Sequence, residues 1–195
     1  MSGGSERTGR VIAIVGRPNV GKSALFNRLA RRRIAIVHEA SGVTRDRIAG
    51  EVQWENERFE LIDTGGVGLI DTVVAADRIE QGTRDQVGIA IEDASVVIFV
   101  TDLTAGIVPL DEEVSRLLHN SGRKVFIAAN KADNPSQDEE TSEFEALGFP
   151  VFPVSALHNR GIGDLMDRAV ASLPPPVPSE EREPLRVAVV GRPNV

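Results

Sequence analysis

The stretch of sequence that decides the fold reads Gly16-Arg17-Pro18-Asn19-Val20-Gly21-Lys22-Ser23. It fits the pattern G-x-x-x-x-G-K followed by Ser or Thr, which gains meaning only between a strand and a helix. Before it, residues 10–15 form an apolar run that is typical of a buried strand. After it, residues 23–32 place Leu25, Phe26 and Leu29 at helical spacing. The match therefore has the context that the pattern requires, and this context disfavours a chance match.

This context predicts a loop that binds phosphate groups. Its glycines allow consecutive backbone N–H groups to point into one concavity, and the N-terminus of the following helix adds partial positive charge. Lys22 is expected to reach the terminal phosphates of a nucleotide, and the Ser23 hydroxyl to ligate Mg²⁺. The rest of the cradle is expected to comprise Gly16, Arg17, Pro18, Asn19, Val20 and Gly21. Taken alone, the loop indicates a nucleoside triphosphate but not its base.

The rest of the chain alternates predicted strands and helices. Strands are expected at residues 48–55, 58–62, 95–101, 124–129 and 151–154. Helices are expected at residues 78–92, 109–120, 136–147 and 161–173, the third of them opened by the capping-box spacing of Ser136 and Glu139. Residues 34–47 show no periodicity and are interpreted as a loop.

The alternation predicts an α/β fold of the P-loop NTPase kind. We expect a mostly parallel six-stranded sheet, with one antiparallel edge strand and helices on both faces. In such sheets, ligands bind at the carboxyl ends of the strands. The candidate motifs of this chain each stand immediately after a predicted strand, so they are expected to lie together.

A second candidate motif, Asp63-Thr64-Gly65-Gly66, follows the strand at 58–62. The Asp63 carboxylate is suited to holding Mg²⁺ through water, because hard cations prefer oxygen ligands. Gly66 offers a backbone N–H that can meet a terminal phosphate with no side chain in the way. Thr44, in the segment without periodicity, is a candidate third ligand of the metal beside Ser23 and Asp63. Standing alone, these residues would be interpreted as an Asp-Gly turn and an ordinary loop threonine.

A third motif indicates which base is bound, and it reads Asn130-Lys131-Ala132-Asp133. The Asp133 carboxylate can accept hydrogen bonds from N1–H and the 2-amine of guanine. Adenine lacks both donors, and sites built for a hydrogen-bonding group reject analogues without it by about 10⁴ or more. The stem of Lys131 can cover the base, and Asn130 can brace the loop. Ser155-Ala156-Leu157, after the last strand, is expected to offer a backbone N–H to guanine O6.

The order of these motifs resembles that of the translation-factor-related GTPases. Gly-Val-Thr-Arg-Asp at residues 42–46, together with the phosphate loop and Asp-Thr-Gly-Gly, is similar to a group of them with two G domains in tandem. The resemblance covers residues 10–173. It implies hydrolysis of GTP to GDP and phosphate as a conformational switch. It also implies a role in assembly of the large ribosomal subunit, with the subunit and its RNA as partners mainly through domains outside this sequence.

The resemblance also bears on how hydrolysis would occur. Val67 stands where many small GTPases have a water-orienting glutamine, and an apolar side chain cannot polarise water. In related GTPases an asparagine of the phosphate loop helps to hold a potassium ion, and Asn19 occupies that place. The catalytic groups expected on this basis are Lys22, Thr44, Gly66 and Asn19. A loop asparagine that merely stabilises its own turn is the simpler alternative for Asn19.

Beyond the first domain the sequence repeats itself. Residues 187–195 match residues 12–20, which predicts the truncated start of a second G domain at 185–195. The proline- and glutamate-rich residues 174–184 are interpreted as a linker, and residues 1–9 as a disordered N-terminus. The G domain itself is expected to span residues 10–173.

Composition excludes several other classes of protein. The 195 residues carry 22 basic and 29 acidic side chains, a net charge of −7, which argues against a surface that wraps bare nucleic acid. There is no cysteine, so a disulfide framework is excluded. No apolar stretch has signal-peptide or membrane-span character, and a cytoplasmic monomer is expected.

Two other functions remain open from the sequence alone. A non-catalytic module that binds a guanine nucleotide and regulates its neighbour is compatible with Val67. A pure RNA-binding scaffold has little support, because aromatic residues make up only 4% of the chain and form no stacking platform.

Overall fold

The computed structural model describes residues 9–30, 34–39, 48–64 and 76–176. Their centre is a seven-stranded sheet in the order β2-β3-β4-β1-β5-β6-β7. The strands are β1 (Val11–Val15), β2 (Ile34–Glu39), β3 (Ile48–Trp54), β4 (Glu57–Asp63), β5 (Val96–Asp102), β6 (Lys124–Asn130) and β7 (Val151–Pro153). The helices are α1 (Lys22–Ala30), α2 (Ala76–Asp93), α3 (Pro109–Ser121) and α4 (Ile162–Ala171), with 3₁₀ segments η1 (Leu103–Ala105), η2 (Pro135–Gln137) and η3 (Glu139–Leu147).

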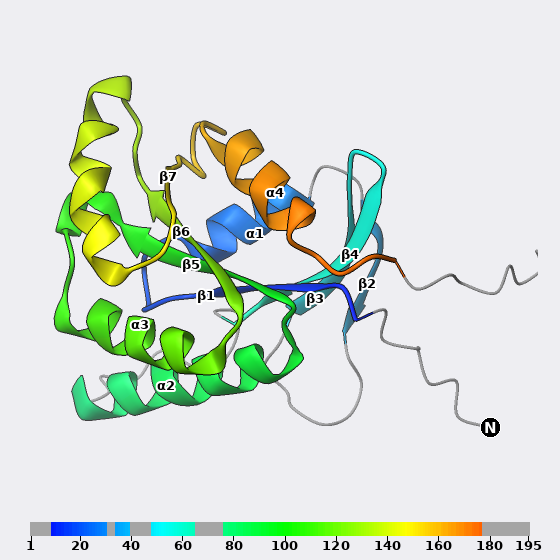
Figure 1. Ribbon diagram of the computed structural model, residues 1–195, viewed down its shortest axis with the longest axis horizontal. Coiled ribbons are helices and arrows are strands. Elements are labelled where there is room, and N and C mark those ends of the chain that lie inside the picture. Colours follow the sequence, from blue (N-terminus) through cyan, green and yellow to red (C-terminus); the bar gives the residue numbers. More distant parts are fainter. Residues whose placement is uncertain (1–8, 31–33, 40–47, 65–75, 177–195) are drawn as a thin grey trace, which may run out of the picture.

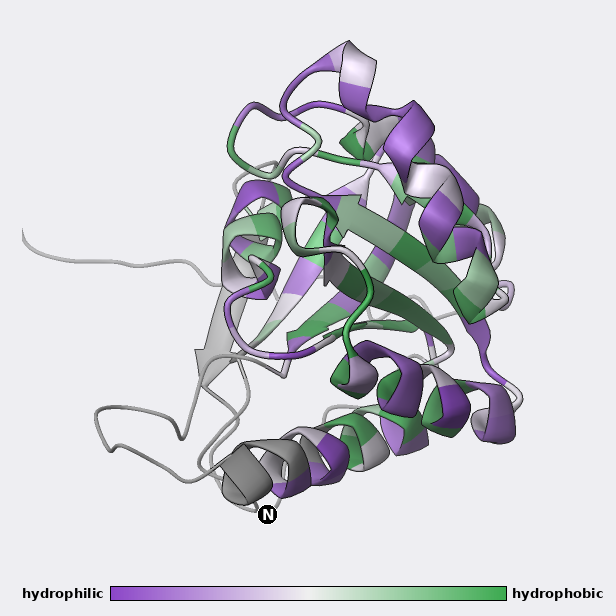
Figure 2. Cartoon of the chain, turned by 90° about the vertical axis from the view of Figure 1, so that its left-hand side faces the viewer, coloured by the Kyte–Doolittle hydropathy of each residue, from purple (hydrophilic) through white to green (hydrophobic). Residues whose placement is uncertain are grey.

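Helices cover both faces of the sheet, with α1 and α4 on one side and α2 and α3 on the other (Figure 1). The central strand β1 is buried along its whole length, because its alternate side chains enter two different cores. Ile12 and Ile14 pack on the side of α1 and α4, whereas Ala13 and Val15 pack on the side of α2 and α3. The strands that are buried along their whole length, β1 and β5, are accordingly mainly apolar. Hydrophilic residues lie on the outer sides of the helices (Figure 2).

The α/β fold class is confirmed, and its sheet is extended by one strand. Residues 34–39, interpreted from the sequence as loop, form the edge strand β2, which pairs antiparallel with β3. Strand β3 also pairs antiparallel with β4. Of these seven strands, β3 is therefore the one antiparallel to the rest, and it is the second strand from the edge, whereas the sequence predicted an antiparallel strand at the edge. The pairing of β2 shifts register between Ile34 and Val37, and this irregularity interrupts the two-residue periodicity that would have predicted it.

The segment that follows the third motif is also different from the expected helix. Residues 139–147 form the 3₁₀ segment η3, and the capping interaction belongs to Asn134, whose N–H donates to Gln137 Oε1 at 3.0 Å. The Thr141 and Ser142 hydroxyls donate to the carbonyls three residues before them, at 2.6 and 2.8 Å. These local bonds compete with the α-helical pattern, so the tighter turn persists.

Several expectations lie outside the described residues. They are the disorder expected of residues 1–8, the linker and second domain expected beyond residue 176, and the structure expected of residues 40–47 and 65–75. Within the described residues, none of the helices combines the length and the apolar character needed to cross a membrane.

Candidate nucleotide-binding site

The motifs predicted from the sequence meet at one edge of the sheet. The phosphate loop follows β1, Asp63 ends β4, Asn130 ends β6, and Ser155 lies two residues after β7. Strands β4, β1, β5, β6 and β7 are neighbours that run parallel, so their carboxyl ends lie on the same side of the domain (Figure 1). The predicted grouping of the described motif residues at this edge is therefore present in the fold.

Two glycines of the phosphate loop are required by close backbone approaches. Gly16 has φ +144°, and a Cβ there would lie 2.3 Å from the Val100 carbonyl oxygen of β5. Gly21 has φ +96°, and a Cβ there would lie 2.3 Å from Asn130 Nδ2. Any larger residue would displace the loop from β5 or from the third motif. Asn19, between them, takes a left-handed conformation with φ +66° and is exposed.

Lys22 is held inside the phosphate loop. Its side chain is only 7% exposed, and Nζ donates to the Arg17 carbonyl at 2.8 Å. Burial lowers the pKa of Lys22, the Asp63 carboxylate partly restores it, and the Arg17 guanidinium lowers it further. A buried ammonium with this environment is stabilised by any anion placed in the loop. The loop thus carries a positive charge suited to a phosphate group.

Asp63 lies beside this lysine at the end of β4 and is fully buried. The neighbouring Thr64 fixes the end of the strand, because its Oγ1 donates to the Ile14 carbonyl at 2.8 Å. Ser23, in the first turn of α1, is exposed. A carboxylate and a hydroxyl in these places provide the oxygen ligands that a hard divalent cation prefers.

Asn130 connects the phosphate loop to the loop after β7. Its Nδ2 donates to the Val20 carbonyl at 2.8 Å, and its Oδ1 accepts from the Ala156 N–H at 3.0 Å. Both hydrogen bonds are buried, and Asn130 is 3% exposed. The predicted bracing role of Asn130 thus has a geometric basis that spans two motifs.

The remaining residues of the third motif are also supported by neighbours. Ser155 Oγ donates to Asp133 Oδ1 at 2.6 Å, and the carboxylate is partly exposed. Lys131 Nζ contacts Asp102 Oδ2 at 2.5 Å. Burial acts to raise the pKa of Asp102, but Lys131 and the Thr104 hydrogen bonds outweigh it, so the pKa lies below its usual value. Ala132 is buried, and its N–H donates to the Val154 carbonyl at 3.0 Å.

Three arginine contacts that support the site were not predicted from the sequence. Arg28 of α1 donates to the carbonyls of Ala156 and Leu157. Arg160 donates to the Ala132 carbonyl at 3.0 Å and pairs with Asp138. These side chains stand far along the chain from their partners, and an isolated arginine on a helix or in a loop carries no sequence signal of such a role.

The third contact joins the phosphate loop to α3. Arg17 Nε lies 3.3 Å from Oδ2 of Asp111, a carboxylate with no exposed surface, and the Val108 N–H donates to the same oxygen at 3.3 Å. Burial raises the pKa of Asp111, and Arg17 and Val108 counter this only in part. Among the described residues, the second oxygen of Asp111 and one terminal nitrogen of Arg17 are buried without a hydrogen-bond partner.

Four predicted site residues have no place in this geometry. Thr44, Gly65, Gly66 and Val67 lie outside the described residues. Leu157 is 70% exposed, and Pro18 is half-buried in the phosphate loop.

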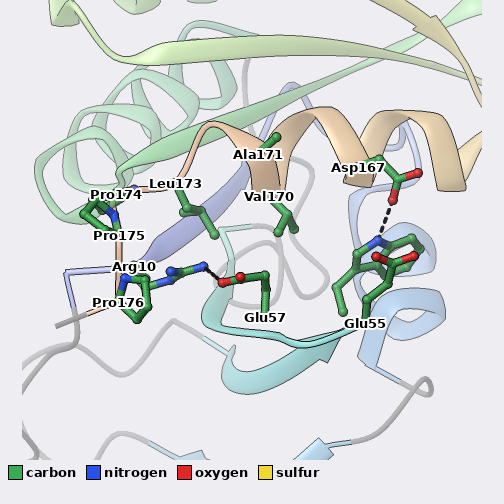
Figure 3. A pocket seen from close by; sticks show the side chains of 11 residues that line it. Arg10, Glu55, Glu57, Asp167, Val170, Ala171, Leu173, Pro174, Pro175 and Pro176 are labelled. Atoms are coloured by element: carbon green, nitrogen blue, oxygen red, sulfur yellow. Dashed lines mark hydrogen bonds and ion pairs between the residues drawn. The ribbon is translucent and has the colours of Figure 1, made fainter. Parts of the chain in front are cut away.

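A pocket of about 380 Å³ lies elsewhere, at the opposite end of the strands (Figure 3). It is bordered by Arg10, which precedes β1 and pairs with Glu57 at the start of β4, and by Pro174–Pro176. Trp54 lines it as well and is 6% exposed, with its indole N–H donating to Asp167 Oδ1 at 2.7 Å. None of the predicted motif residues lines this pocket.

The fold, the phosphate loop and the Asn-Lys-x-Asp loop together define the G domain of a P-loop GTPase. The chain belongs to the family of 50S ribosome-binding GTPases, whose model matches residues 11–131.

Curated relatives include proteins named GTPase Der. The one from Latilactobacillus sakei is 45% identical over 187 residues, which make up 95% of this chain and 42% of that protein. The one from Symbiobacterium thermophilum is 48% identical over 189 residues, which make up 95% of this chain and 39% of that protein. The chain thus spans about two fifths of the length of these relatives.

Solved structures of Era are similar to this chain. Era in complex with MgGDPNP and nucleotides 1506–1542 of 16S ribosomal RNA superposes with a TM-score of 0.67 at 28% identity, over 87% of this chain and 58% of that one. An Aquifex aeolicus Era variant bound to GDP and AlF4⁻ superposes with a TM-score of 0.65 at 27% identity, over 85% and 57%.

We predict that Asn130→Ala uncouples the two loops. The substitution leaves the Val20 carbonyl and the Ala156 N–H buried without their partner, and each such group costs about 1–3 kcal/mol. The free energy of unfolding should fall by about 2–4 kcal/mol, and GDP affinity should fall with it. Chemical denaturation and calorimetric titration measure the two effects. Asn120→Ala, exposed near the end of α3, is the control, and equal behaviour of the two variants would contradict the bracing role.

We predict that Lys22→Met weakens nucleotide binding. The folded-state pKa of Lys22 lies below the ordinary value of 10.5, so the protonated side chain opposes folding at pH below the folded-state pKa, and the cost vanishes above 10.5. Methionine removes that cost and the charge together. GDP affinity should fall by about 10- to 100-fold, from the loss of a charge-assisted contact. The thermal unfolding temperature of the nucleotide-free protein, measured separately, reports the balance between removing the buried lysine charge and removing the cation beside the buried Asp63 carboxylate. An unchanged affinity would contradict the phosphate-loop assignment.

Proposed function

We propose that this chain binds GTP, hydrolyses it to GDP and phosphate, and changes conformation with the nucleotide it holds. The observation that carries the proposal is the pair of buried hydrogen bonds by which Asn130 joins the phosphate loop to the loop after β7. A ligand that contacts both loops needs a polyphosphate at one end and a base at the other. The family match supports the same conclusion.

Guanine is the base that the polar groups of the site favour. Asp133 accepts from Ser155 through Oδ1, and His158 Nε2 lies 3.9 Å from its Oδ2. The carboxylate remains partly exposed, so the lone pairs that Ser155 does not use can accept from N1–H and the 2-amine of guanine. An adenine in the same place would present an acceptor to this carboxylate. The ammonium of Lys131 contacts Asp102. The aliphatic stem of Lys131 would cover one face of the base.

The oxygen ligands at the phosphate end fit Mg²⁺. Asp63 is a fully buried carboxylate beside Lys22, and Ser23 offers an exposed hydroxyl one residue after that lysine. We propose that Ser23 and Asp63 hold the ion together with Thr44. When bound, Mg²⁺ would neutralise charge on the terminal phosphates.

The residues of this chain have distinct proposed roles in hydrolysis. Lys22 stabilises negative charge that develops on the phosphate oxygens. The Gly66 N–H and the Thr44 hydroxyl orient the terminal phosphate and the attacking water. Asn19 is exposed at the rim of the loop in a left-handed turn, where its amide oxygen can help to hold a potassium ion. That ion would add the positive charge that an arginine supplies in other GTPases.

The cellular role is proposed from the relatives. The family is that of 50S ribosome-binding GTPases, and the curated relatives are longer proteins named GTPase Der. We propose that this chain is the first G domain of a cytoplasmic protein with a repeated G domain, joined through residues 174–184 to a second domain beginning near residue 185. Its partner would be the large ribosomal subunit and its RNA, and the isolated domain would be a monomer.

A non-catalytic docking module is the alternative function, because Val67 replaces a water-orienting side chain. The two functions predict different results for one measurement, the single-turnover hydrolysis of bound GTP.

We predict that this single turnover is slow and depends on the monovalent cation. GTP hydrolysis should be about tenfold or more faster in KCl than in NaCl, because a site whose oxygen ligands suit the larger K⁺ would hold Na⁺ poorly, so that only K⁺ adds its charge at the phosphates. Asn19→Gly keeps the left-handed backbone and removes the amide, so it should abolish the difference while GDP affinity is retained. Equal rates in the two salts would remove the role of Asn19. No turnover in either salt, with GTP still bound, would favour the docking module.

We predict that Asp133→Asn changes the preferred base. Asparagine can still accept from Ser155 through Oδ1, but it presents an amide donor where the carboxylate accepted. Affinity for GDP should fall by about 10²-fold or more, and xanthosine diphosphate, which carries an oxygen in place of the 2-amine, should become the better ligand. Competition titration measures the preference. Asp164→Asn, exposed on α4, is the control, and a persistent preference for guanine would contradict the base-reading role.

A further inference from the structure

Arg28 connects the helix of the phosphate loop to the loop after β7. Its Nε donates to the Ala156 carbonyl at 3.1 Å, and one terminal nitrogen donates to the Leu157 carbonyl at 2.6 Å. The side chain is half-buried and belongs to α1, the helix that begins at Lys22. Helices α1 and α4 cover the same face of the sheet, which brings Arg28 next to the loop that precedes α4 (Figure 1).

This contact determines which backbone donor of the loop is available. The N–H of Ser155 donates to the Arg160 carbonyl, and the N–H of Ala156 donates to Asn130 Oδ1. The N–H of His158 donates to Ser155 Oγ. The N–H groups of Ala156 and His158, on either side of Leu157, are therefore engaged in hydrogen bonds. The Leu157 N–H is not a donor in any of these bonds of the described loop.

The orientation of the Leu157 N–H follows from the contact with Arg28. The Ala156 carbonyl and the Leu157 N–H belong to one trans peptide unit, in which the two groups point in opposite directions. Because Arg28 holds that carbonyl, the N–H is directed away from α1. A guanidinium on the carbonyl also polarises the peptide and strengthens its N–H as a donor.

We propose that Arg28 is a positioning residue for base selectivity, which acts by aiming the Leu157 N–H at O6 of the bound base. This inference rests on the proposed guanine-nucleotide function and adds a residue to it. Asp133 reads the N1–H and 2-amine of guanine, and Arg28 secures the reading of the oxygen at position 6. The two readings are chemically separable, since they concern different groups of the base.

Two nucleotide analogues separate the readings. In 6-thio-GDP a sulfur, a weak acceptor, replaces O6, while N1–H and the 2-amine remain. In inosine diphosphate O6 remains and the 2-amine is missing. Arg28→Gln should lower GDP affinity by about three- to tenfold, the worth of one hydrogen bond, and should shrink the preference for GDP over 6-thio-GDP by the same factor. The preference for GDP over inosine diphosphate should not change.

The matched control is Arg116→Gln, an exposed arginine on α3 whose loss should leave all three affinities unchanged. Arg28→Lys, which keeps the charge but not the forked geometry, serves as a second variant if the glutamine variant does not fold. Isothermal titration of each variant with the three nucleotides gives the ratios. Equal loss in both preferences would assign Arg28 a merely structural role and overturn the proposal. Failure of the unsubstituted protein to bind GDP would instead overturn the proposed function.

Discussion

The two hydrogen bonds of Asn130 form the interaction on which the candidate site depends. They connect Val20 of the phosphate loop, after β1, to Ala156 of the loop after β7, although strands β5 and β6 lie between β1 and β7 in the sheet. An amide is the side chain suited to this place, because it donates on one side and accepts on the other. Gly21 is required opposite it, since a Cβ there would lie 2.3 Å from Asn130 Nδ2. A single buried side chain thus bridges the two ends of the site.

The charges around this bridge give the site an electrostatic character that suits an anion. Lys22 and Asp63 are buried side by side, and Asp111 is buried with an incomplete pairing to Arg17. Buried charges of this kind are costly without full compensation. A guanine nucleotide bound in the loop would supply the missing compensation for the lysine, and a ligand that binds only the folded state stabilises it.

The sequence predicted those parts of the site that are local in the chain. The phosphate loop, Asp63 and the residues from Asn130 to Asp133 are contiguous motifs whose spacing carries the chemistry, and the fold brings them to one edge. Arg28, Arg160 and the Arg17–Asp111 pair were not predicted, because each depends on a partner that only the folded chain places nearby. Strand β2 was missed for a related reason: its irregular pairing with β3 is not visible in local periodicity. The 3₁₀ segment η3 depends on hydroxyl contacts that a capping pattern does not reveal.

The outer strand β7 has a consequence for how the domain behaves at high concentration. It has only three residues, Pro153 ends it, and Pro150 directly precedes it. Proline has no N–H, so a strand from another molecule that approached this side would find too few donors to continue the hydrogen-bond ladder. The sheet therefore stops growing at β7, and the domain is protected there against edge-to-edge aggregation.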